Sequence, residues 1–583
     1  MSQSALLFVN QATSRNGRRV AKVLEFFGVP SRIVDATDFS LDDGMDGSSS
    51  HKIRALGSAE AFLQTIETLE REPGYNKWWT ESVHSAFVYA GNNVDSLQRL
   101  ARTLTDGHRG EVYDINRAGA DLAVSDQLSS FCGAMSGMRL TATKRNSNDD
   151  LVLNTANAVR IISLGDGATF SKLEYKGVPV FLSTSREIID IDAELASQNF
   201  DVREHFLSAV PLVLYIKWAF QTCWNAPETN ACVVIDDPVL KPTHGFVDFE
   251  ELLSLMNQHN FSTNIAFIPW NWRRSAPDVV RLFRDNPERY SLSVHGCDHT
   301  RAEFGSSNQQ RLYWKAQQAI QRMDRHRSIT GIHHDPVMVF PQGIFSEAAM
   351  DVLRHTGLIA SVNNDIISAD PHPRAITVSD VWDIAVMRYS FPLFTRRYPW
   401  EGIENFAFDA LLGKPAIAVI HHDYCSDQCA RLVNFIQRLN ALHRAPTWRN
   451  LGEVVRRSCR QREVSPGAVE VEMYGTELRI ENRSDQAKHF LIRRRDHEAS
   501  AIQQICVGAQ GISWKPVNGH IELEIKLNPG ENQVIQIRFY DAAEKRRSGD
   551  NLAYRLKAML RRYLCEVRDN YIVPMRFRFA GYR

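Results

Sequence analysis

The sequence has no excess of either charge. Its 583 residues include 68 lysines and arginines and 68 aspartates and glutamates, so the formal net charge is zero at pH 7. A protein dedicated to nucleic acid needs a basic excess that neutralises phosphates, and a solvating acidic chain needs the opposite. The balance therefore predicts no nucleic-acid partner. With 44% hydrophobic residues, the chain has enough apolar side chains to bury several cores.

Long apolar runs and a disulfide framework are also missing. The most apolar stretch, residues 205–224, is interrupted by Lys217 and Gln221, and we expect a buried helix there. The first residues lack the basic segment and the long apolar core of a secretory signal. The nine cysteines are odd in number and widely scattered, as expected of reduced thiols. We therefore expect a cytoplasmic protein.

Four regions of different pattern follow one another, and together they predict a multidomain α/β protein. Residues 1–205 alternate short β-rich runs with helical ones and carry no glycine-rich nucleotide motif, so we expect an α/β domain with a regulatory or assembly role. A second α/β rhythm covers residues 206–462. Period-two strands separated by Asn, Gly and Pro turns predict a small β-sandwich over residues 463–545.

The last region, residues 546–583, contains a basic amphipathic helix. Helical spacing from Leu552 to Val567 gathers leucines and other apolar residues on one face, opposite Arg555, Arg561 and Arg562. We expect the apolar face to pack on the body of the protein. Docking on an anionic membrane surface, which would make the protein membrane-associated, or on a protein partner is the alternative.

Two carboxylates, Asp236 and Asp237, directly follow a buried-looking strand over residues 232–235. Carboxylates at the carboxyl end of a strand in an α/β fold lie at the rim where such folds build their sites. A turn that begins with aspartate and is helped by Pro238 is the alternative interpretation.

Two histidines, His295 and His299, follow another apolar run, residues 290–294, which we expect to be a strand. Imidazoles four residues apart can bind one metal ion, although this spacing alone is a weak signal among 19 histidines. One aspartate with two histidines makes a three-ligand set with an open position for water, which is typical of catalytic rather than structural zinc.

A third strand, residues 417–420, leads into His421 and His422. Period-two alternation places these two side chains on opposite faces, so only one imidazole should enter a site at the strand end. That histidine could serve as a general acid, and ordinary hydrogen bonding at a strand end is the alternative.

In this order and at these separations, the three motifs resemble the NodB-homology polysaccharide deacetylases, which include carbohydrate esterase family 4. The resemblance covers about residues 230–430 and implies a distorted (β/α) barrel. It implies that Asp236 is the general base, that Asp237, His295 and His299 bind a divalent cation, usually Zn²⁺, and that His421 is the general acid.

Two features depart from the family pattern. The first motif reads Asp236-Asp237-Pro238 where the family has a glycine in the third position. The family's Arg-x-Pro-aromatic motif is represented only by residues 340–345, which lack the arginine that orients the base. The sequence therefore does not say how Asp236 is held.

The resemblance implies a metal-dependent hydrolase that removes N-acetyl groups from an amino-sugar polysaccharide, oligosaccharide or precursor. The partner would be this carbohydrate, and Trp270 and Trp272, between the first two motifs, offer rings that could stack on sugar faces. Core packing of these tryptophans is equally expected. Two other functions stay open: a non-catalytic carbohydrate-binding or assembly protein that retains the barrel, and an amidohydrolase with a non-sugar substrate.

Overall fold

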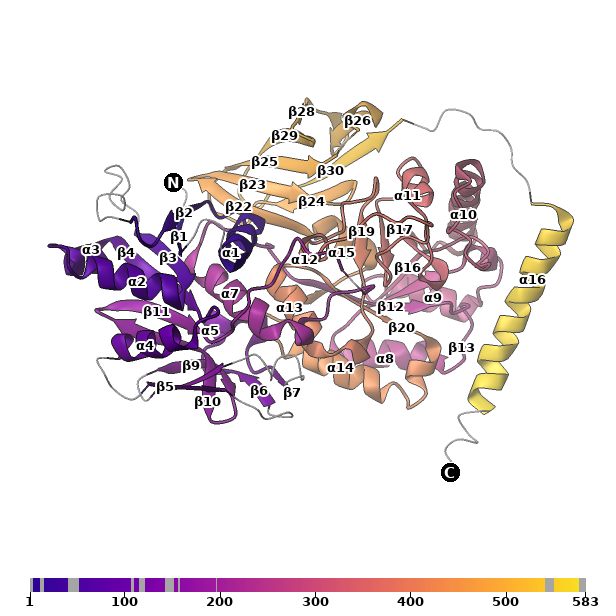
Figure 1. Cartoon of the computed structure of the whole chain (residues 1–583). Coiled ribbons are helices and arrows are strands. Elements are labelled where there is room, and N and C mark those ends of the chain that lie inside the picture. Colours follow the sequence, from indigo (N-terminus) through magenta and orange to yellow (C-terminus); the bar gives the residue numbers. More distant parts are fainter. Residues whose placement is uncertain are drawn as a thin grey trace. The chain divides into compact units, whose positions relative to one another are not determined.

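The computed structural model describes residues 4–10, 15–39, 52–105, 110–114, 121–141, 151–155, 158–195, 197–496, 498–540 and 550–575. The chain divides into two compact units, coloured by sequence in Figure 1. One comprises Met1–Ala193 with Asp201–Trp224, and the other comprises Glu194–Phe200 with Asn225–Arg583. Among the helices in the described ranges, none has both the length and the apolar character needed to cross a membrane.

The first unit is built on one mixed sheet in the order β2-β1-β3-β4-β11-β10-β9-β6-β7. The first five strands in this order are parallel: β2 (Ser31–Asp35), β1 (Ala5–Val9), β3 (Ile53–Ser58), β4 (Val83–Tyr89) and β11 (Val178–Ser183). The remaining strands pair in antiparallel fashion: β10 (Gly167–Tyr175), β9 (Val159–Leu164), β6 (Asp121–Val124) and β7 (Arg139–Thr141), with β5 (Gly110–Asp114) and β8 (Leu151–Thr155) beside them.

Helices of this unit connect the parallel strands and bury apolar faces. They are α1 (Arg15–Phe26), α2 (Ala59–Leu69), α3 (Tyr75–Ser82), α4 (Val94–Leu104), α5 (Ser129–Cys132) and α7 (Phe206–Ala219). The α7 helix is buried along most of its length, in agreement with its apolar sequence on all sides. Asn93 begins α4 because its side chain accepts a hydrogen bond from the Ser96 amide.

The second unit contains a parallel, nearly closed barrel in the order β19-β18-β17-β16-β15-β12-β20. Its strands are β12 (Asn230–Asp236), β15 (Thr263–Phe267), β16 (Tyr290–His295), β17 (His334–Val339), β18 (Ala360–Asn363), β19 (Leu393–Thr395) and β20 (Ala416–Ile420). Every residue of β12 is buried, as expected of a parallel strand that is covered on both faces. A parallel bridge between Arg397 and Ala418 connects the chain after β19 to β20 and closes the ring.

Helices follow most of these strands. They are α8 (Phe249–His259), α9 (Pro277–Asp285), α10 (Gln309–Thr330), α11 (Glu347–Leu353), α12 (Val378–Trp382), α13 (Ile403–Leu412), α14 (Ala430–Asn440) and α15 (Leu451–Arg457), with the short strands β13 (Thr243–His244), β14 (Val247–Asp248) and β21 (Thr447–Trp448). Asp248 begins α8 by accepting from two amide groups, and Asn260 ends it in the left-handed conformation. The predicted (β/α) barrel is therefore confirmed.

Two further sheets follow the barrel and confirm the predicted β-sandwich. One has the order β22 (Cys459–Ser465), β23 (Ala468–Met473), β25 (Lys488–Arg495), β29 (His520–Leu527), β28 (Lys515–Val517). The other has the order β24 (Glu477–Glu481), β30 (Asn532–Phe539), β26 (Ile502–Val507), β27 (Gln510–Gly511). Alternate residues of these strands, such as Val471, Ile492 and Ile535, form one core.

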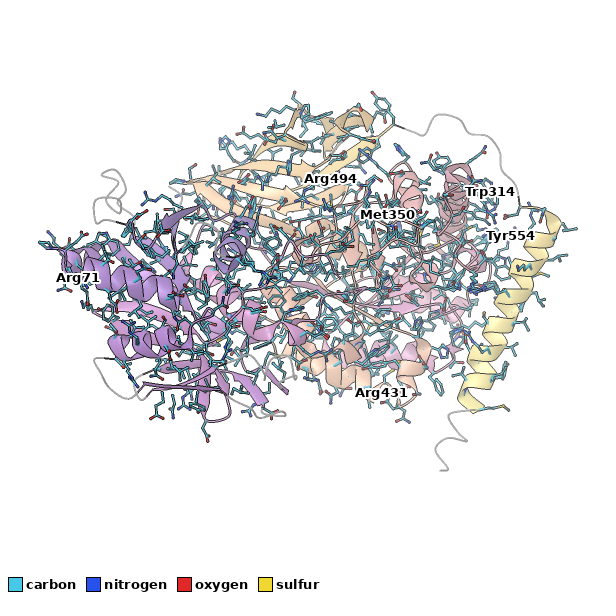
Figure 2. All side chains as sticks on the ribbon, in the orientation of Figure 1. Arg71, Trp314, Met350, Arg431, Arg494 and Tyr554 are labelled. Atoms are coloured by element: carbon cyan, nitrogen blue, oxygen red, sulfur yellow. The ribbon has the colours of Figure 1, made fainter. Side chains whose placement is uncertain are left out.

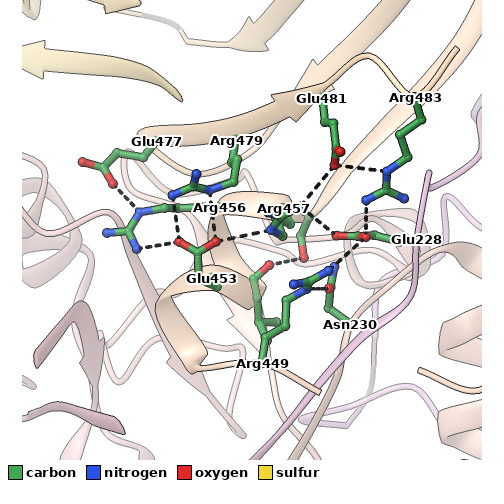
Figure 3. A network of polar contacts seen from close by, with 12 residues as sticks. Glu228, Asn230, Arg449, Glu453, Arg456, Arg457, Glu477, Arg479, Glu481 and Arg483 are labelled. Carbon is green, nitrogen blue, oxygen red and sulfur yellow. Dashed lines mark hydrogen bonds and ion pairs between the residues drawn. The ribbon is translucent and has the colours of Figure 1, made fainter. Parts of the chain in front are cut away.

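Ion pairs connect the sandwich to the barrel within the second unit (Figure 3). Glu453 of α15 lies 3.1 Å from Arg479 of β24, and Glu228, just before β12, lies 2.6 Å from Arg483. Each carboxylate also contacts arginines of the barrel, so the pairs form a network rather than isolated bridges. Because each carboxylate pairs with arginines of both parts, this network links the sandwich to the barrel.

The last long helix among the described residues is α16 (Leu552–Val567), which continues as a single wide turn over Arg568–Ile572. The helix is confirmed, but the expectation that its apolar face packs on the body is wrong. Leu556, Leu560 and Leu564 are 52%, 60% and 59% exposed, whereas Ala558 and Arg562 are buried. The helix therefore lies against the barrel with its more polar side.

Candidate metal centre

The three predicted motifs meet at the carboxyl rim of the barrel. Asp236 ends β12, His295 ends β16, and His421 follows β20. β20 pairs directly with β12, and β15 alone separates β12 from β16. Because parallel strands end at the same edge, motifs that are far apart in the sequence become neighbours here.

Asp237, His295 and His299 converge as predicted. The Asp237 Oδ1 atom lies 3.5 Å from His295 Nε2 and 3.1 Å from His299 Nε2, and the three groups could hold one metal ion. Asp237 Oδ1 is buried and makes no hydrogen bond of normal geometry. One orphaned carboxylate oxygen that faces two imidazole nitrogens fits a divalent cation.

The chain orients each of these ligands. His295 Nδ1 lies 3.0 Å from the Val339 carbonyl oxygen of β17, which leaves Nε2 for the cation. Asp237 and His299 both have positive φ angles, 80° and 54°, an uncommon conformation for residues other than glycine. Although burial alone would raise the pKa of the Asp237 carboxyl, His299 and His295 hold this pKa well below its usual range.

The loop that carries His299 is held by the half-buried carboxylate of Glu303. Glu303 accepts hydrogen bonds from the backbone amides of Cys297, Asp298 and His299, at 2.9 to 3.1 Å. Asp298 in turn pairs with Lys315 and, at 2.6 Å, with Arg322. Cys297, Asp298 and Glu303 also lie close enough to hold a metal ion, but these carboxylates are already occupied by the loop and by α10. We assign this second cluster a structural role.

An arginine that the sequence motifs did not reveal holds Asp236. Arg396, directly after β19, donates from Nη1 and Nη2 to both carboxylate oxygens of Asp236 at 2.7 Å, and its Nε donates to Asn364. Both partners are buried. Burial would raise the pKa of Asp236, but Arg396, His295 and His421 together lower it. Arg396 thus gives Asp236 the guanidinium partner that residues 340–345 do not supply.

The two consecutive histidines have different surroundings. His421 lies near enough to Asp236 to help lower its pKa, and its ring centroid is 6.3 Å from that of Tyr398. His422 is buried, and its Nε2 lies 3.4 Å from Asp569 in the turn that follows α16. The alternation expected from the strand therefore separates the two side chains, with His421 on the side of Asp236.

The predicted sugar platforms, Trp270 and Trp272, already have partners. The ring of Trp270 meets Tyr563 of α16 edge to face at 5.9 Å, and the Arg273 guanidinium lies 4.1 Å from the ring centroid of Trp272. A different aromatic residue, Trp400, is more accessible than either. Trp400 is 59% exposed and stacks on Tyr398 with ring centroids 4.2 Å apart, close to His421. No motif in the sequence distinguished these two rings from core aromatics.

A cavity of about 210 Å³ lies beside the candidate metal centre, and α16 forms part of its wall. Asp237 and His299 line it from the barrel, and Arg562 and Asp569 line it from the C-terminal segment. His244 also lines it: this side chain is 2% exposed, both of its ring nitrogens lack hydrogen-bond partners among the described residues, and burial lowers its pKa to about 4. A neutral, buried imidazole therefore faces the cavity.

The fold and the site together define a (β/α) barrel that carries one carboxylate and two imidazoles as candidate metal ligands at its carboxyl rim. No protein-family model matches the sequence. No curated protein matches it either.

Solved structures of carbohydrate deacetylases do match. One is Agd3, described as a novel carbohydrate deacetylase, with 8% identity, a TM-score of 0.48 and coverage of 92% of this chain and 98% of that chain. Another is a family 4 carbohydrate esterase from Streptomyces lividans in complex with acetate, with 14% identity, a TM-score of 0.22 and coverage of 36% and 86%. A T48 deacetylase with substrate has 11% identity, a TM-score of 0.22 and coverage of 36% and 82%. At these identities the likeness concerns the fold alone.

Removal of one predicted ligand should abolish metal retention. We expect His295→Ala to weaken the affinity for a divalent cation by more than about 100-fold, because even the groups that only orient a ligand contribute 10- to 100-fold. Elemental analysis of the dialysed full-length protein measures this. His443→Ala, at an exposed position, is the matched control and should keep the wild-type metal content. A stoichiometric metal in His295→Ala would contradict the assignment.

Removal of one partner of the buried Asp236–Arg396 pair should destabilise the fold more than removal of both. We expect Arg396→Leu to lower the free energy of unfolding by about 3–5 kcal/mol, because it leaves the carboxylate buried and unpaired. The double variant Asp236→Leu with Arg396→Leu should lose less, since no lone charge remains. Urea denaturation measures both, with Arg374→Leu, which breaks an exposed pair with Glu347, as the control. Equal losses in the single and double variants would contradict the pairing.

Proposed function

We propose that the protein is a metal-dependent hydrolase that removes the N-acetyl group from an amino sugar within a polysaccharide, an oligosaccharide or a precursor of one. The observation that carries this proposal is the arrangement of Asp236. Its carboxylate is kept ionised by Arg396 and directly precedes Asp237, one of three candidate metal ligands. An ionised base next to a three-ligand set with an open position suits the hydrolysis of an amide.

The residues divide the work of the reaction. When bound by Asp237, His295 and His299, a divalent cation supplies Lewis acidity and lowers the pKa of a bound water. Asp236 accepts a proton from the attacking water, whose oxygen forms a bond to the acetyl carbon. His421 donates a proton to the amide nitrogen as the carbon–nitrogen bond breaks, so that acetate and a free amine leave. Two imidazoles and one carboxylate favour zinc, which is our proposal for the metal.

The exposed Trp400, stacked on the half-buried Tyr398, supports a sugar as the substrate. Stacked rings near His421 offer an apolar surface on which the face of a pyranose can lie. The missing arginine and the three accessory regions favour the alternative of a non-catalytic barrel. Arg396 removes the first of these two reasons, because Asp236 has its guanidinium partner.

Acetate release tests the proposed reaction. Full-length protein loaded with zinc, cobalt or nickel should release acetate from N-acetylglucosamine oligomers. Wild-type protein that is fully loaded with metal but releases no acetate from these or other N-acetylated glycans would overturn the proposal.

The roles of individual residues can be separated by their effects on kcat. We expect Asp236→Asn and His421→Asn each to lower kcat by about 10²–10⁴-fold with the metal content unchanged, because each removes one proton transfer. His422→Asn is the matched control, since this neighbouring side chain faces Asp569 instead. A larger loss in His422→Asn than in His421→Asn would reverse the assignment of the acid.

A further inference from the structure

The helix α16 is attached to the barrel by polar contacts around the metal centre. Glu566 pairs with Lys241 and Arg274, and the Gly245 amide donates to Asn570 Oδ1 at 2.7 Å. At the other end, the Tyr554 hydroxyl donates to Asp298 Oδ2 at 3.1 Å. Figure 2 labels Tyr554 of α16 and Trp314 of α10. The C-terminal segment is therefore part of the site and not an appended tail.

Two arginines of this helix, Arg561 and Arg562, line the cavity without an acidic partner among the described residues. Arg562 is only 7% exposed, and its Nη2 lies 3.4 Å from His299 Nδ1. The Nε atoms of both side chains are buried and lack hydrogen-bond partners in the described part of the chain. Two neighbouring guanidinium groups with unsatisfied donors are costly unless an anion binds there.

The charges around the cavity favour such an anion. Four arginines line it, Arg274, Arg561, Arg562 and Arg568, against the three carboxylates of Asp237, Glu566 and Asp569. Glu566 and Asp569 are occupied by Arg274 and Arg568, and Asp237 faces the two histidines of the metal centre. A divalent cation at that centre would make the cavity more positive still.

We propose that Arg561 and Arg562 bind an oxyanion, a carboxylate or phosphate group, that the substrate carries beside its acetamide. The guanidinium fork donates two parallel hydrogen bonds to either group. The anion would lie next to His299, so it would fix an acidic amino sugar with its acetamide at the metal centre. The assignment of the anion to the substrate rests on the proposed function, whereas the anion site itself rests on the two arginines.

Calorimetric titration of the full-length protein tests the anion site without any turnover. Glucosamine 6-phosphate and galacturonate, which carry no acetyl group, are the phosphate and carboxylate probes, and glucosamine is the probe without an oxyanion. We expect one of the two anionic probes to bind at least tenfold more tightly than glucosamine. The Arg561→Gln, Arg562→Gln double variant should lose this preference for the anionic probe. The conservative variant Arg562→Lys should keep part of it.

The matched control is Arg555→Gln, which removes the same charge from an exposed position of the same helix. It should bind as the wild type does. Equal binding of all three probes, or an anion preference that survives the double variant with unchanged folding by circular dichroism, would overturn the proposal. Absence of acetate release together with arginine-dependent anion binding would reject the deacetylase function and leave the anion site intact.

The face of α16 that points away from the cavity exposes many large apolar side chains. Ten of the eighteen exposed large hydrophobic residues in the described part of the chain lie within residues 552–575, with exposures from 42% to 72%. They are Leu552, Leu556, Met559, Leu560, Tyr563, Leu564, Val567, Tyr571, Ile572 and Met575. An apolar surface of this extent on one helix indicates an interaction site.

The charges beside this apolar face favour an anionic lipid surface. Arg555 and Lys557 are exposed, while the acidic residues of the same segment, Glu566 and Asp569, face the barrel. A helix with exposed leucines, tyrosines and cations, but with its carboxylates turned away, has the pattern of helices that lie in the interface of a membrane. We infer that the outer face of α16 docks on an anionic bilayer.

Co-sedimentation of the full-length protein with vesicles tests this docking. We expect binding to phosphatidylcholine vesicles that contain phosphatidylglycerol, and at least tenfold weaker binding to vesicles of phosphatidylcholine alone. Leu556→Asp with Leu560→Asp should abolish binding. Ile329→Asp with Val464→Asp, two exposed apolar residues on other elements, is the matched control and should bind normally. Failure to sediment with either vesicle, or dimers in light scattering that depend on the two leucines, would overturn the inference.

Discussion

The ion pair between Asp236 and Arg396 is the interaction on which the site depends. A carboxylate at the end of a fully buried strand cannot remain ionised without a partner, because burial favours its neutral form. Arg396 supplies that partner with two parallel hydrogen bonds. It reaches Asp236 only because the bridge between Arg397 and Ala418 brings the end of β19 to β20, which itself pairs with β12. Closure of the barrel thus places beside Asp236 the guanidinium group that keeps its carboxylate ionised.

At the same rim, backbone conformation and backbone hydrogen bonds position two of the candidate metal ligands, Asp237 and His299. Asp237 and His299 adopt positive φ angles, and the Glu303 carboxylate gathers three successive amides of the loop that carries His299. Such a loop would not keep this shape without its carboxylate, since the amides would be buried and unpaired. The chain's own hydrogen bonds therefore hold the loop that carries His299, one of the three candidate ligands.

The parts of the site that the sequence predicts are those that follow strands. Asp237, His295 and His299 come directly after apolar runs, and the rule that parallel strands end at one edge brings them together. Arg396 stands 160 residues from Asp236 in a segment without a recognisable motif, and only the closure of the barrel joins them. The helix over residues 552–567 was predicted from its periodicity, but periodicity identifies the apolar face without saying what covers it. Its contribution to the cavity could not be predicted for that reason.

The part of the cavity wall that α16 forms is attached differently from the part that the barrel forms. The barrel strands are held by buried apolar side chains, whereas α16 is held largely by ion pairs and hydrogen bonds such as those of Glu566 and Asn570. Contacts of this kind contribute about 0.5–3 kcal/mol each and weaken as salt rises. The position of Arg562 beside His299 therefore depends on polar contacts of α16 that weaken as the salt concentration rises. The two faces of α16 are thus different in kind: the inner face supplies Arg562 and Glu566 to the cavity, and the outer face exposes Leu556, Leu560 and Leu564.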